Sequence, residues 1–176
     1  MQRLATMRTA QLPSEWLDSV RALCDAVFDT FTDDDWQHAL GGWHAVLLDG
    51  DSALAHAAVV PRTLYVAEQP YAVGYVEAVA TAAAHQGQGL GSRVMIEINA
   101  LVREHFEIGG LATGAHPFYE RLGWERWQGP TYARDGDVTR RTEDDDDSVM
   151  VLRCGPSADA DLTAALTCET RPGDVW

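Results

Sequence analysis

The sequence predicts a single α+β domain over residues 1–176. Two observations carry this prediction. Apolar residues form strand-like runs through residues 43–81, with turn residues between them, and the spacing changes to a helical repeat at Leu90. A shorter pattern of strand, helix and strand follows. Antiparallel strands that precede a strand–helix–strand unit are typical of an α+β fold.

Two helices are expected before the strands. Apolar residues recur at a helical spacing over residues 14–31, which predicts an amphipathic helix. The acidic residues 33–35 can cap a second, short helix, which the pair Gly41-Gly42 ends. Residues 1–12 show no clear pattern and are expected to form a short leader.

Four strands should follow, over residues 43–48, 53–60, 63–67 and 71–81. The turn Asp49-Gly50-Asp51 predicts a hairpin between the first two. A long helix is expected from Leu90 to about Phe106, because apolar residues recur there every three or four positions. The remaining predicted elements are a strand at 109–113, a helix opened by Pro117, strands at 124–132 and 149–154, and between these two a polar loop ending in the acidic run 143–147.

The charge balance favours cations over anions as partners, but from composition alone solubility is the better explanation of the acidic surface. Thirteen Lys and Arg residues against 27 Asp and Glu residues give a net charge of −14, which disfavours nucleic acid and anionic lipid as partners. The sequence has no apolar run long enough to span a membrane and no secretion signal, so we expect a cytoplasmic protein. The three cysteines are far apart and the histidines lack metal-ligand spacing. We therefore expect reduced thiols, no bound metal, and histidines that serve as ordinary surface or packing residues.

A glycine-rich loop, residues 86–91, joins the last predicted strand to the long helix. Its three glycines at alternate positions allow positive φ and close approach of a ligand, and the helix start offers unpaired N–H groups. Together these features predict a pyrophosphate site. A dinucleotide fold fits poorly because the third glycine comes one position early and the preceding strands are antiparallel. No Gly-Lys-Ser/Thr follows, so the loop is not a P-loop. A purely structural turn is the alternative.

The pattern Gln86-x-x-Gly89-x-Gly91 resembles the pyrophosphate loop of the GNAT acetyltransferase superfamily. The resemblance implies the GNAT fold, a mixed and mostly antiparallel sheet of about six to seven strands with flanking helices, in a single GNAT domain. It implies acetyl-CoA as the donor and coenzyme A as a product. The expected contacts with the cofactor are Val79, Ala80, Thr81, Gln86, Gly87, Gln88, Gly89, Leu90 and Gly91.

Further motifs are similar to the aminoglycoside 2'-N-acetyltransferases, and this likeness spans roughly residues 10–176. They are Leu40-Gly41-Gly42, Gly74-Tyr75-Val76-Glu77, Leu122-Gly123-Trp124, the acidic run, and Gly173-Asp174-Val175-Trp176. The resemblance implies transfer of an acetyl group to the 2'-amino group of an aminoglycoside, and hence antibiotic resistance.

The resemblance also assigns roles in catalysis. Glu77 would be the general base, acting through a water, because a largely protonated amine must lose a proton before it attacks a thioester. The backbone N–H of Val79, beside a strand bulge, would stabilise the oxyanion. Tyr119 would be the general acid for the departing thiolate. An exposed strand carboxylate and a packing aromatic are the structural alternatives for Glu77 and Tyr119.

The expected substrate-binding residues are Asp29, Ala78, Thr113, Asp144, Asp145, Asp174 and Trp176, to which the chain's own carboxylate adds negative charge. A solvated loop is the alternative for the acidic run. Three departures from the family lie on this acceptor side. The segment Asp29-Thr30-Phe31 is one residue short, so either Asp29 or Thr30 fills the acidic position, or the contact is lost. Trp43 replaces the usual methionine, and residues 112–117 are about two residues short.

The acceptor therefore stays open among several amines. A 2-deoxystreptamine aminoglycoside is the family's default, and kasugamycin is a candidate because the pocket is altered. A polyamine or another small amine would keep the chemistry but change the acceptor. A non-catalytic protein that binds coenzyme A or an aminoglycoside is the alternative of another class. Superfamily members often form homodimers, but the sequence does not decide the oligomeric state.

Overall fold

The computed structural model describes residues 1–176, and the chain divides into two compact units. The first consists of residues 1–60 and 76–101, and the second of residues 61–75 and 102–176. Antiparallel strands precede a strand–helix–strand unit as predicted for an α+β fold, but there are ten strands where six to seven were expected. That the chain is one domain stays a prediction.

The first unit contains four strands side by side. They are β1 (Gln2–Arg8), β2 (Trp43–Asp49), the first part of β3 (Ser52–Val66) and the last part of β4 (Gln69–Thr81). The predicted leader is thus a strand, which pairs antiparallel with β2 along its whole length. β2 and β3 form the predicted hairpin, and Gly50 in its turn has a φ of 61°.

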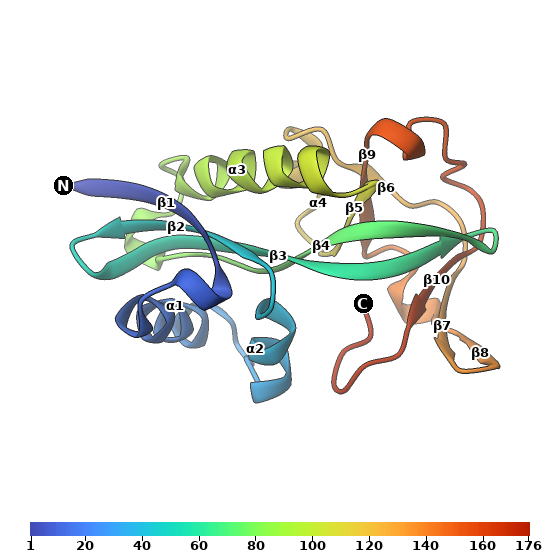
Figure 1. Ribbon diagram of the computed structural model, residues 1–176, viewed down its shortest axis with the longest axis horizontal. Helices are drawn as coiled ribbons and strands as arrows, with labels where there is room; N and C mark the ends of the chain where they lie inside the picture. The colour runs from blue at the N-terminus through green and yellow to red at the C-terminus, as the bar shows by residue number, and fades with distance from the viewer. The chain divides into compact units, whose positions relative to one another are not determined.

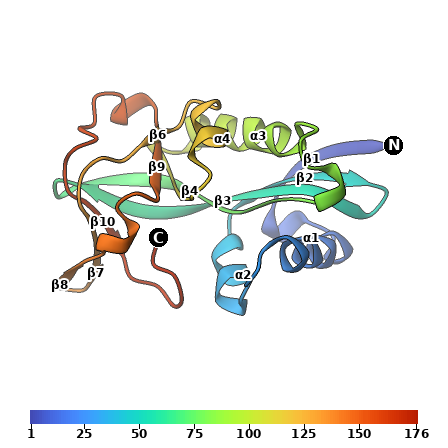
Figure 2. The same ribbon diagram turned by 180° about the vertical axis from the view of Figure 1, so that it is seen from behind.

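Helices cover both faces of these strands. α1 (Ser14–Val27) and α2 (Asp33–Ala39) lie on one side, and the first part of α3 (Leu90–His105) lies on the other (Figures 1 and 2). The apolar face of α1 packs against β2 and β4, where Trp16, Val20 and Cys24 share a core with Val46 and Ala80. Removing such apolar surface from water is the main stabilising contribution to this unit.

The start of α2 differs from the prediction. Its N-cap is Thr32, whose hydroxyl accepts a hydrogen bond from the Asp35 N–H while the Asp35 carboxylate accepts one from the Thr32 N–H. The acidic residues therefore fill the first turn, where the helix dipole favours negative charge, rather than the cap position.

The second glycine of the Gly41-Gly42 pair sets β2 closely against β3. A Cβ at Gly42 would lie 2.0 Å from the carbonyl oxygen of Val59, so no side chain fits at this position. The Gly42 carbonyl also accepts a hydrogen bond from the Thr9 N–H, at 3.0 Å. The glycine pair therefore both follows the end of α2 and allows the close approach of β2 and β3.

A chain of polar side chains crosses the core of the first unit. The Thr9 hydroxyl lies 2.8 Å from His44 Nε2, and His44 Nδ1 lies 2.9 Å from His56 Nε2. His56 Nδ1 in turn lies 2.8 Å from the carbonyl oxygen of Ala78 in β4. Both imidazoles are 0% exposed, and burial lowers the pKa of each below its usual 6.5. The pair is buried as packing residues are, and its hydrogen bonds are a feature that the sequence did not indicate.

The second unit is built mainly of short strands. β3 and β4 are joined there by the turn Ala67-Glu68, whose positive φ values of 46° and 71° are typical of a tight hairpin. The strand order is β6 (Glu125–Arg126), β9 (Val149–Arg153), β5 (Ile108–Ala112), β4, β3, β10 (Leu166–Glu169), β7 (Thr131–Asp135) and β8 (Val138–Arg141). The pairs β4/β5 and β10/β7 are parallel, so the sheet is mixed as predicted. Besides the end of α3, the second unit contains the short helix α4 (His116–Glu120).

Several predicted strands have different bounds. β3 runs through Pro61, because the fixed φ of proline is compatible with an extended backbone. The strand expected at residues 124–132 is two separate strands, β6 and β7. The predicted polar loop contains β8, and the tail contains β10. Short 3₁₀ turns complete the chain at Thr9–Gln11, Ala83–His85, Glu143–Asp145 and Gly155–Ser157. None of the helices has both the length and the apolar character needed to span a membrane.

We predict that Gly42→Ala lowers the free energy of unfolding by about 1–3 kcal/mol, because the added methyl group overlaps the Val59 carbonyl. Urea denaturation would measure the loss. Gly114→Ala is the matched control, since a Cβ there meets no atom within 4 Å and the backbone needs no positive φ. Equal stability of the two variants would contradict the prediction.

We also predict that the protein loses stability as the pH falls below 6.5. The folded chain keeps His44 and His56 neutral, whereas the unfolded chain protonates them at their ordinary pKa, so the unfolded state binds more protons. Each histidine adds a slope of up to about 1.4 kcal/mol per pH unit. Urea titrations between pH 7.5 and 5 would measure it, and a His44→Asn variant should show a shallower dependence. A flat profile would contradict the burial of two neutral imidazoles.

Candidate active site

The predicted pyrophosphate loop is open on its outer side. Gly87 and Gly89 have φ values of 73° and 79°, and a Cβ at either position would meet no atom within 4 Å. α3 begins at Leu90, directly after the loop, and the Gly89 carbonyl accepts the first bond of this helix from the Arg93 N–H at 3.1 Å. The N–H groups of the first helical turn have no partner inside the helix. An anionic group fits this arrangement.

Two glutamine side chains brace the loop from its own chain. Gln86 Nε2 donates to the Thr81 carbonyl and Gln88 Nε2 donates to the Ala84 carbonyl, each at 3.2 Å. These bonds use the side-chain amides, and the Gln86 N–H donates to the Ala83 carbonyl at 3.4 Å. The segment from Gln86 to Gly91 therefore forms a glycine-rich turn at a helix start, which suits a pyrophosphate.

β4 is irregular where the reacting groups are expected. Ala78 has a φ of 50°, a conformation that non-glycine residues adopt with strain, and it lies between Glu77 and Val79. The three residues in a row, 77–79, are half-buried, so the strict alternation of a strand is broken here. The predicted strand irregularity beside Val79 is thus present. The Ala78 carbonyl oxygen, at this irregular position, is the one that lies within hydrogen-bond distance of His56 Nδ1.

Tyr119, the predicted general acid, lies on α4 in the second unit. Its ring is 7% exposed and packs edge-to-face against Phe118 and Trp124. Burial raises the pKa of Tyr119 to about 12, so the phenol keeps its proton at neutral pH. A protonated phenol can donate a proton, and the aromatic packing that served as the alternative is also real.

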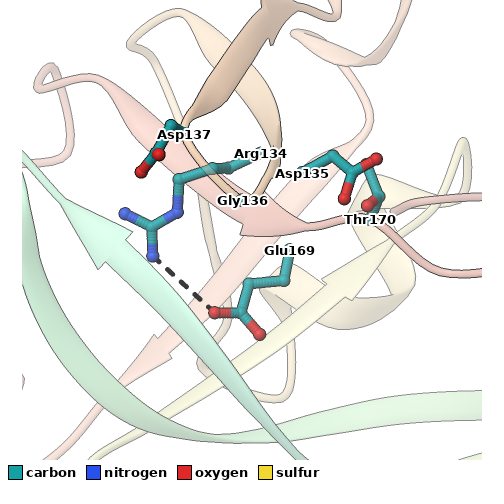
Figure 3. A pocket seen from close by; sticks show the side chains of 6 residues that line it. All are labelled: Arg134, Asp135, Gly136, Asp137, Glu169 and Thr170. Atoms are coloured by element: carbon teal, nitrogen blue, oxygen red, sulfur yellow. Dashed lines mark ion pairs between the residues drawn. The ribbon is translucent and has the colours of Figure 1, made fainter.

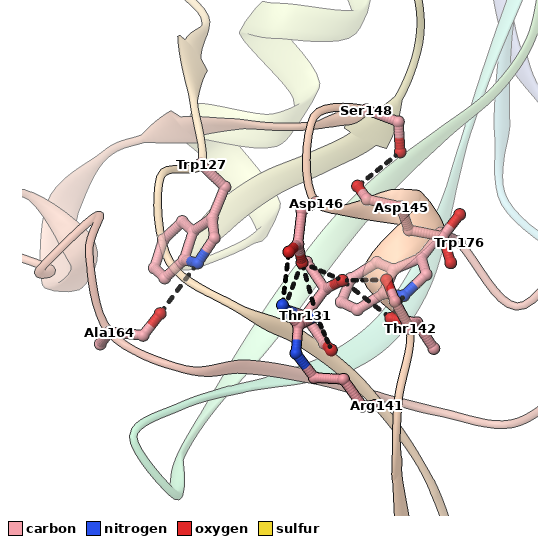
Figure 4. Close-up of polar contacts among 9 residues, drawn as sticks. All are labelled: Trp127, Thr131, Arg141, Thr142, Asp145, Asp146, Ser148, Ala164 and Trp176. Carbon is pink, nitrogen blue, oxygen red and sulfur yellow. Dashed lines mark hydrogen bonds and ion pairs between the residues drawn. The ribbon is translucent and has the colours of Figure 1, made fainter.

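The acidic run separates into residues with different tasks. Asp146 accepts hydrogen bonds from the backbone and hydroxyl of Thr131, both at 2.9 Å, and forms an ion pair with Arg141, which holds the pKa of Asp146 well below its usual range. Asp145 points away from this network (Figure 4). Partial burial raises the pKa of Asp145, and the negative charges of Asp174 and Asp144 raise it further. A cation beside Asp145 would relieve both effects.

The C-terminal segment is held next to the acidic run. The Trp176 indole is 4% exposed, and its Nε1 donates to the Thr142 hydroxyl at 3.0 Å (Figure 4). The Asp174 carboxylate accepts a bond from the Trp176 N–H at 3.3 Å, and Arg171 Nε donates to the Asp174 carbonyl at 2.8 Å. Trp176 therefore anchors the segment that carries the exposed Asp174.

Thr113 belongs to the same neighbourhood. Its N–H donates to the Ser148 carbonyl at 2.8 Å, and the Ser148 N–H donates to the Asp145 carbonyl. The Ser148 hydroxyl donates to the same carbonyl (Figure 4). Four predicted acceptor residues of the second unit, Thr113, Asp145, Asp174 and Trp176, are thus connected by hydrogen bonds or charge. Asp144 is exposed beside them. Asp29 and Thr30 lie on the first unit, exposed after α1, and nothing there decides between them.

A separate open pocket lies at the far end of the second unit's β7–β8 hairpin. Arg134, Asp135, Gly136, Asp137, Glu169 and Thr170 line it, and Arg134 forms an ion pair with Glu169 across 3.7 Å (Figure 3). No predicted site residue lines this pocket.

Two features of the site were missed at the level of the sequence. His44 and His56 stand in apolar strand runs, a place where a polar side chain needs a buried partner, and this was the available signal. Nothing in the sequence indicated that Asp146 forms bonds within the protein. Its partners Thr131 and Arg141 lie in β7 and β8, and the five acids of the run look alike in the sequence.

The chain is similar to characterised acetyltransferases. Residues 7–127 match the family described as acetyltransferase (GNAT) domain. A protein of Mycolicibacterium fortuitum named aminoglycoside 2'-N-acetyltransferase is 38% identical over 175 residues, which cover 97% of this chain and 90% of that protein.

Solved structures show the same fold. The GNAT family N-acetyltransferase YhbS from Escherichia coli, solved in complex with CoA, superposes with a TM-score of 0.64 at 18% identity, covering 96% of this chain and 88% of that one. A GCN5-related N-acetyltransferase from Kribbella flavida gives a TM-score of 0.60 at 21% identity over 74% of this chain, which spans only 34% of that longer protein. These likenesses confirm the GNAT fold.

A family match over more than half of the chain agrees with a relative that is similar over nearly its whole length. The chain is therefore an acetyltransferase of the GNAT superfamily, and within it belongs to the aminoglycoside 2'-N-acetyltransferase family.

Proposed function

We propose that the protein transfers the acetyl group of acetyl-CoA to the 2'-amino group of an aminoglycoside antibiotic and thereby confers resistance in the cytoplasm, where acetyl-CoA is made. The observation that carries the proposal is the 38% identity, over almost the whole chain, to a protein named for this activity. The open glycine loop and the acidic residues of the second unit support it, because they suit an anionic donor and a cationic acceptor.

Acetyl-CoA supplies an activated thioester. The loop at residues 86–91 would hold its pyrophosphate with the N–H groups of the α3 start, and β4 would hold the pantetheine arm through residues 79–81. The chain's own residues then have three tasks, which are to remove a proton from the amine, to stabilise the oxyanion, and to protonate the sulfur that departs.

Glu77 takes one proton from the ammonium group of the acceptor, through a water, and frees the nitrogen lone pair. The nitrogen then forms a bond to the carbonyl carbon, and the Val79 N–H donates to the oxygen on which charge develops. As the oxyanion collapses, the carbon–sulfur bond breaks. Tyr119 gives its phenolic proton to the sulfur, and the second proton of the amine returns the phenol to its neutral state. The products are an amide and coenzyme A.

Recognition of the acceptor would rest on charge. Asp145 is half-buried among the like charges of Asp144 and Asp174, and the whole chain carries a net charge of −14. A polycationic sugar neutralises this cluster and is drawn toward it over a long range. The bulky Trp43 and the short segment at residues 112–117 alter the acceptor side. Kasugamycin is therefore a candidate acceptor as well as the 2-deoxystreptamine compounds.

We predict thiol release from acetyl-CoA when an aminoglycoside is added, with the acetyl group on the 2'-nitrogen. Mass spectrometry of products from a panel containing kasugamycin, gentamicin-type compounds and spermidine would measure it. Glu77→Gln should lower kcat about 10²- to 10⁴-fold, because the general base is lost. A clear preference for spermidine would indicate a polyamine acetyltransferase instead. No turnover with any amino sugar would contradict the proposal.

We predict that Asp145→Asn raises KM for the acceptor about 10-fold and leaves KM for acetyl-CoA unchanged, since one charge-assisted hydrogen bond to a cation is lost. The matched control is Asp146→Asn. It breaks the bonds to Thr131 and Arg141, so it should lower the melting temperature. Steady-state kinetics and thermal denaturation separate the two effects. A higher KM for acetyl-CoA in Asp145→Asn would contradict the assignment.

A further inference from the structure

We propose that His56 and His44 are positioning residues for acetyl transfer: they hold the Ala78–Val79 peptide so that the Val79 N–H is presented to the acetyl carbonyl. The inference rests on the proposed role of Val79 as the oxyanion donor. It deepens that role by naming what keeps this donor in place. All the residues concerned belong to the first unit.

The direction of every hydrogen bond in the chain follows from its last member. A carbonyl oxygen can only accept, so His56 Nδ1 must carry the hydrogen that bonds to Ala78. A neutral imidazole has one N–H, which makes His56 Nε2 an acceptor. His44 Nδ1 must therefore donate to it, across 2.9 Å, and His44 Nε2 is left as an acceptor.

The directions of the hydrogen bonds at the Thr9 end of the chain follow in the same way. The Thr9 hydroxyl donates to His44 Nε2 at 2.8 Å, and the Thr9 oxygen accepts from the Gly41 N–H at 3.0 Å. One arrangement of hydrogens thus satisfies the whole chain from Gly41 to Ala78. A second proton on His56 would place two N–H groups opposite each other, and burial disfavours a charge on either imidazole.

The chain ends on a peptide that needs support. Ala78 has a φ of 50°, which costs a residue with a Cβ about 1–2 kcal/mol, so the surrounding structure must hold it. In a planar trans peptide the C=O of one residue and the N–H of the next point in opposite directions. The bond from His56 to the Ala78 oxygen therefore fixes the direction in which the Val79 N–H points.

The bond also changes the strength of the donor. A peptide whose oxygen accepts a hydrogen bond is more polarised, and its N–H becomes a better donor. His44 adds to this effect because it donates to His56 in the same sense. A pair that served only to fill the core would not require this single direction. An apolar pair of similar volume would fill the space without holding Ala78.

The test uses three variants and a readout that needs no acceptor. His56→Leu removes the bond to Ala78, whereas His56→Asn keeps an N–H near the position of Nδ1. Leu47→Ala is the matched control, since Leu47 is fully buried in β2 but does not belong to the chain. Isotope-edited infrared spectroscopy measures the carbonyl stretch of ¹³C-labelled acetyl-CoA bound to each protein.

In the wild-type protein we expect the stretch at a lower frequency than in free acetyl-CoA. His56→Leu should move it back toward the free value and lower kcat about 10- to 100-fold, with KM for acetyl-CoA and Kd for coenzyme A unchanged, because the pyrophosphate loop is intact. His56→Asn should keep most of the shift. Leu47→Ala should keep all of it, whatever its stability.

An unchanged stretch in folded His56→Leu would overturn the inference. No shift in the wild-type protein would overturn both this inference and the oxyanion role of Val79. The product assay would still decide independently whether the protein transfers acetyl groups. Nitrogen-15 NMR of the wild-type protein gives a check that needs no variant. It should show both imidazoles as neutral Nδ1–H tautomers, and an Nε2–H tautomer of His56 would overturn the inference.

Discussion

A hydrogen bond between a side chain and the main chain, from His56 to Ala78, connects the interior of the first unit to its most irregular backbone. Its geometry depends on the register of β2 with β3, since His44 and His56 must meet on one face. That register in turn depends on the close approach at Gly42, whose carbonyl receives the Thr9 N–H. Thr9 and the two histidines thus connect the start of β2 to the residue of β4 with positive φ, Ala78.

The electrostatics of the two units serve opposite needs. The first offers N–H groups at the start of α3, which suit an anion. The second concentrates carboxylates, and only some of them are neutralised inside the protein. Asp146 is committed to Arg141, whereas Asp145 is destabilised in its charged form by burial and by Asp174. The net charge of −14 is spread over both units, and the acidic run 143–147 with Asp174 is the part of it where a cationic substrate is proposed to bind.

The sequence predicted what local pattern determines. The helices α1 and α3, the β2–β3 hairpin and the glycine loop follow from periodicity and turn chemistry, and the motifs led to the correct family. β1, β8 and β10 were missed because short strands with mixed side chains gain their stability from a partner far along the chain, as Leu166 does from Val66. The hydrogen bonds of the histidine pair were missed for the same reason, since Ala78 is remote from His56 in sequence. The catalytic and substrate roles of individual residues stay predictions.

The commitment of Asp146 to Arg141 and Thr131 bears on how natural variation in this gene should be interpreted. Five acids in a row look interchangeable to an alignment, yet they influence a cell by two routes. A change at Asp146 alters the fraction of chains that stay folded, and so the amount of enzyme present. If Asp144 and Asp145 contact the acceptor as proposed, a change at either residue leaves the amount intact and alters which amines the enzyme accepts. Two strains with equally altered tolerance could therefore differ in abundance in one case and in drug spectrum in the other.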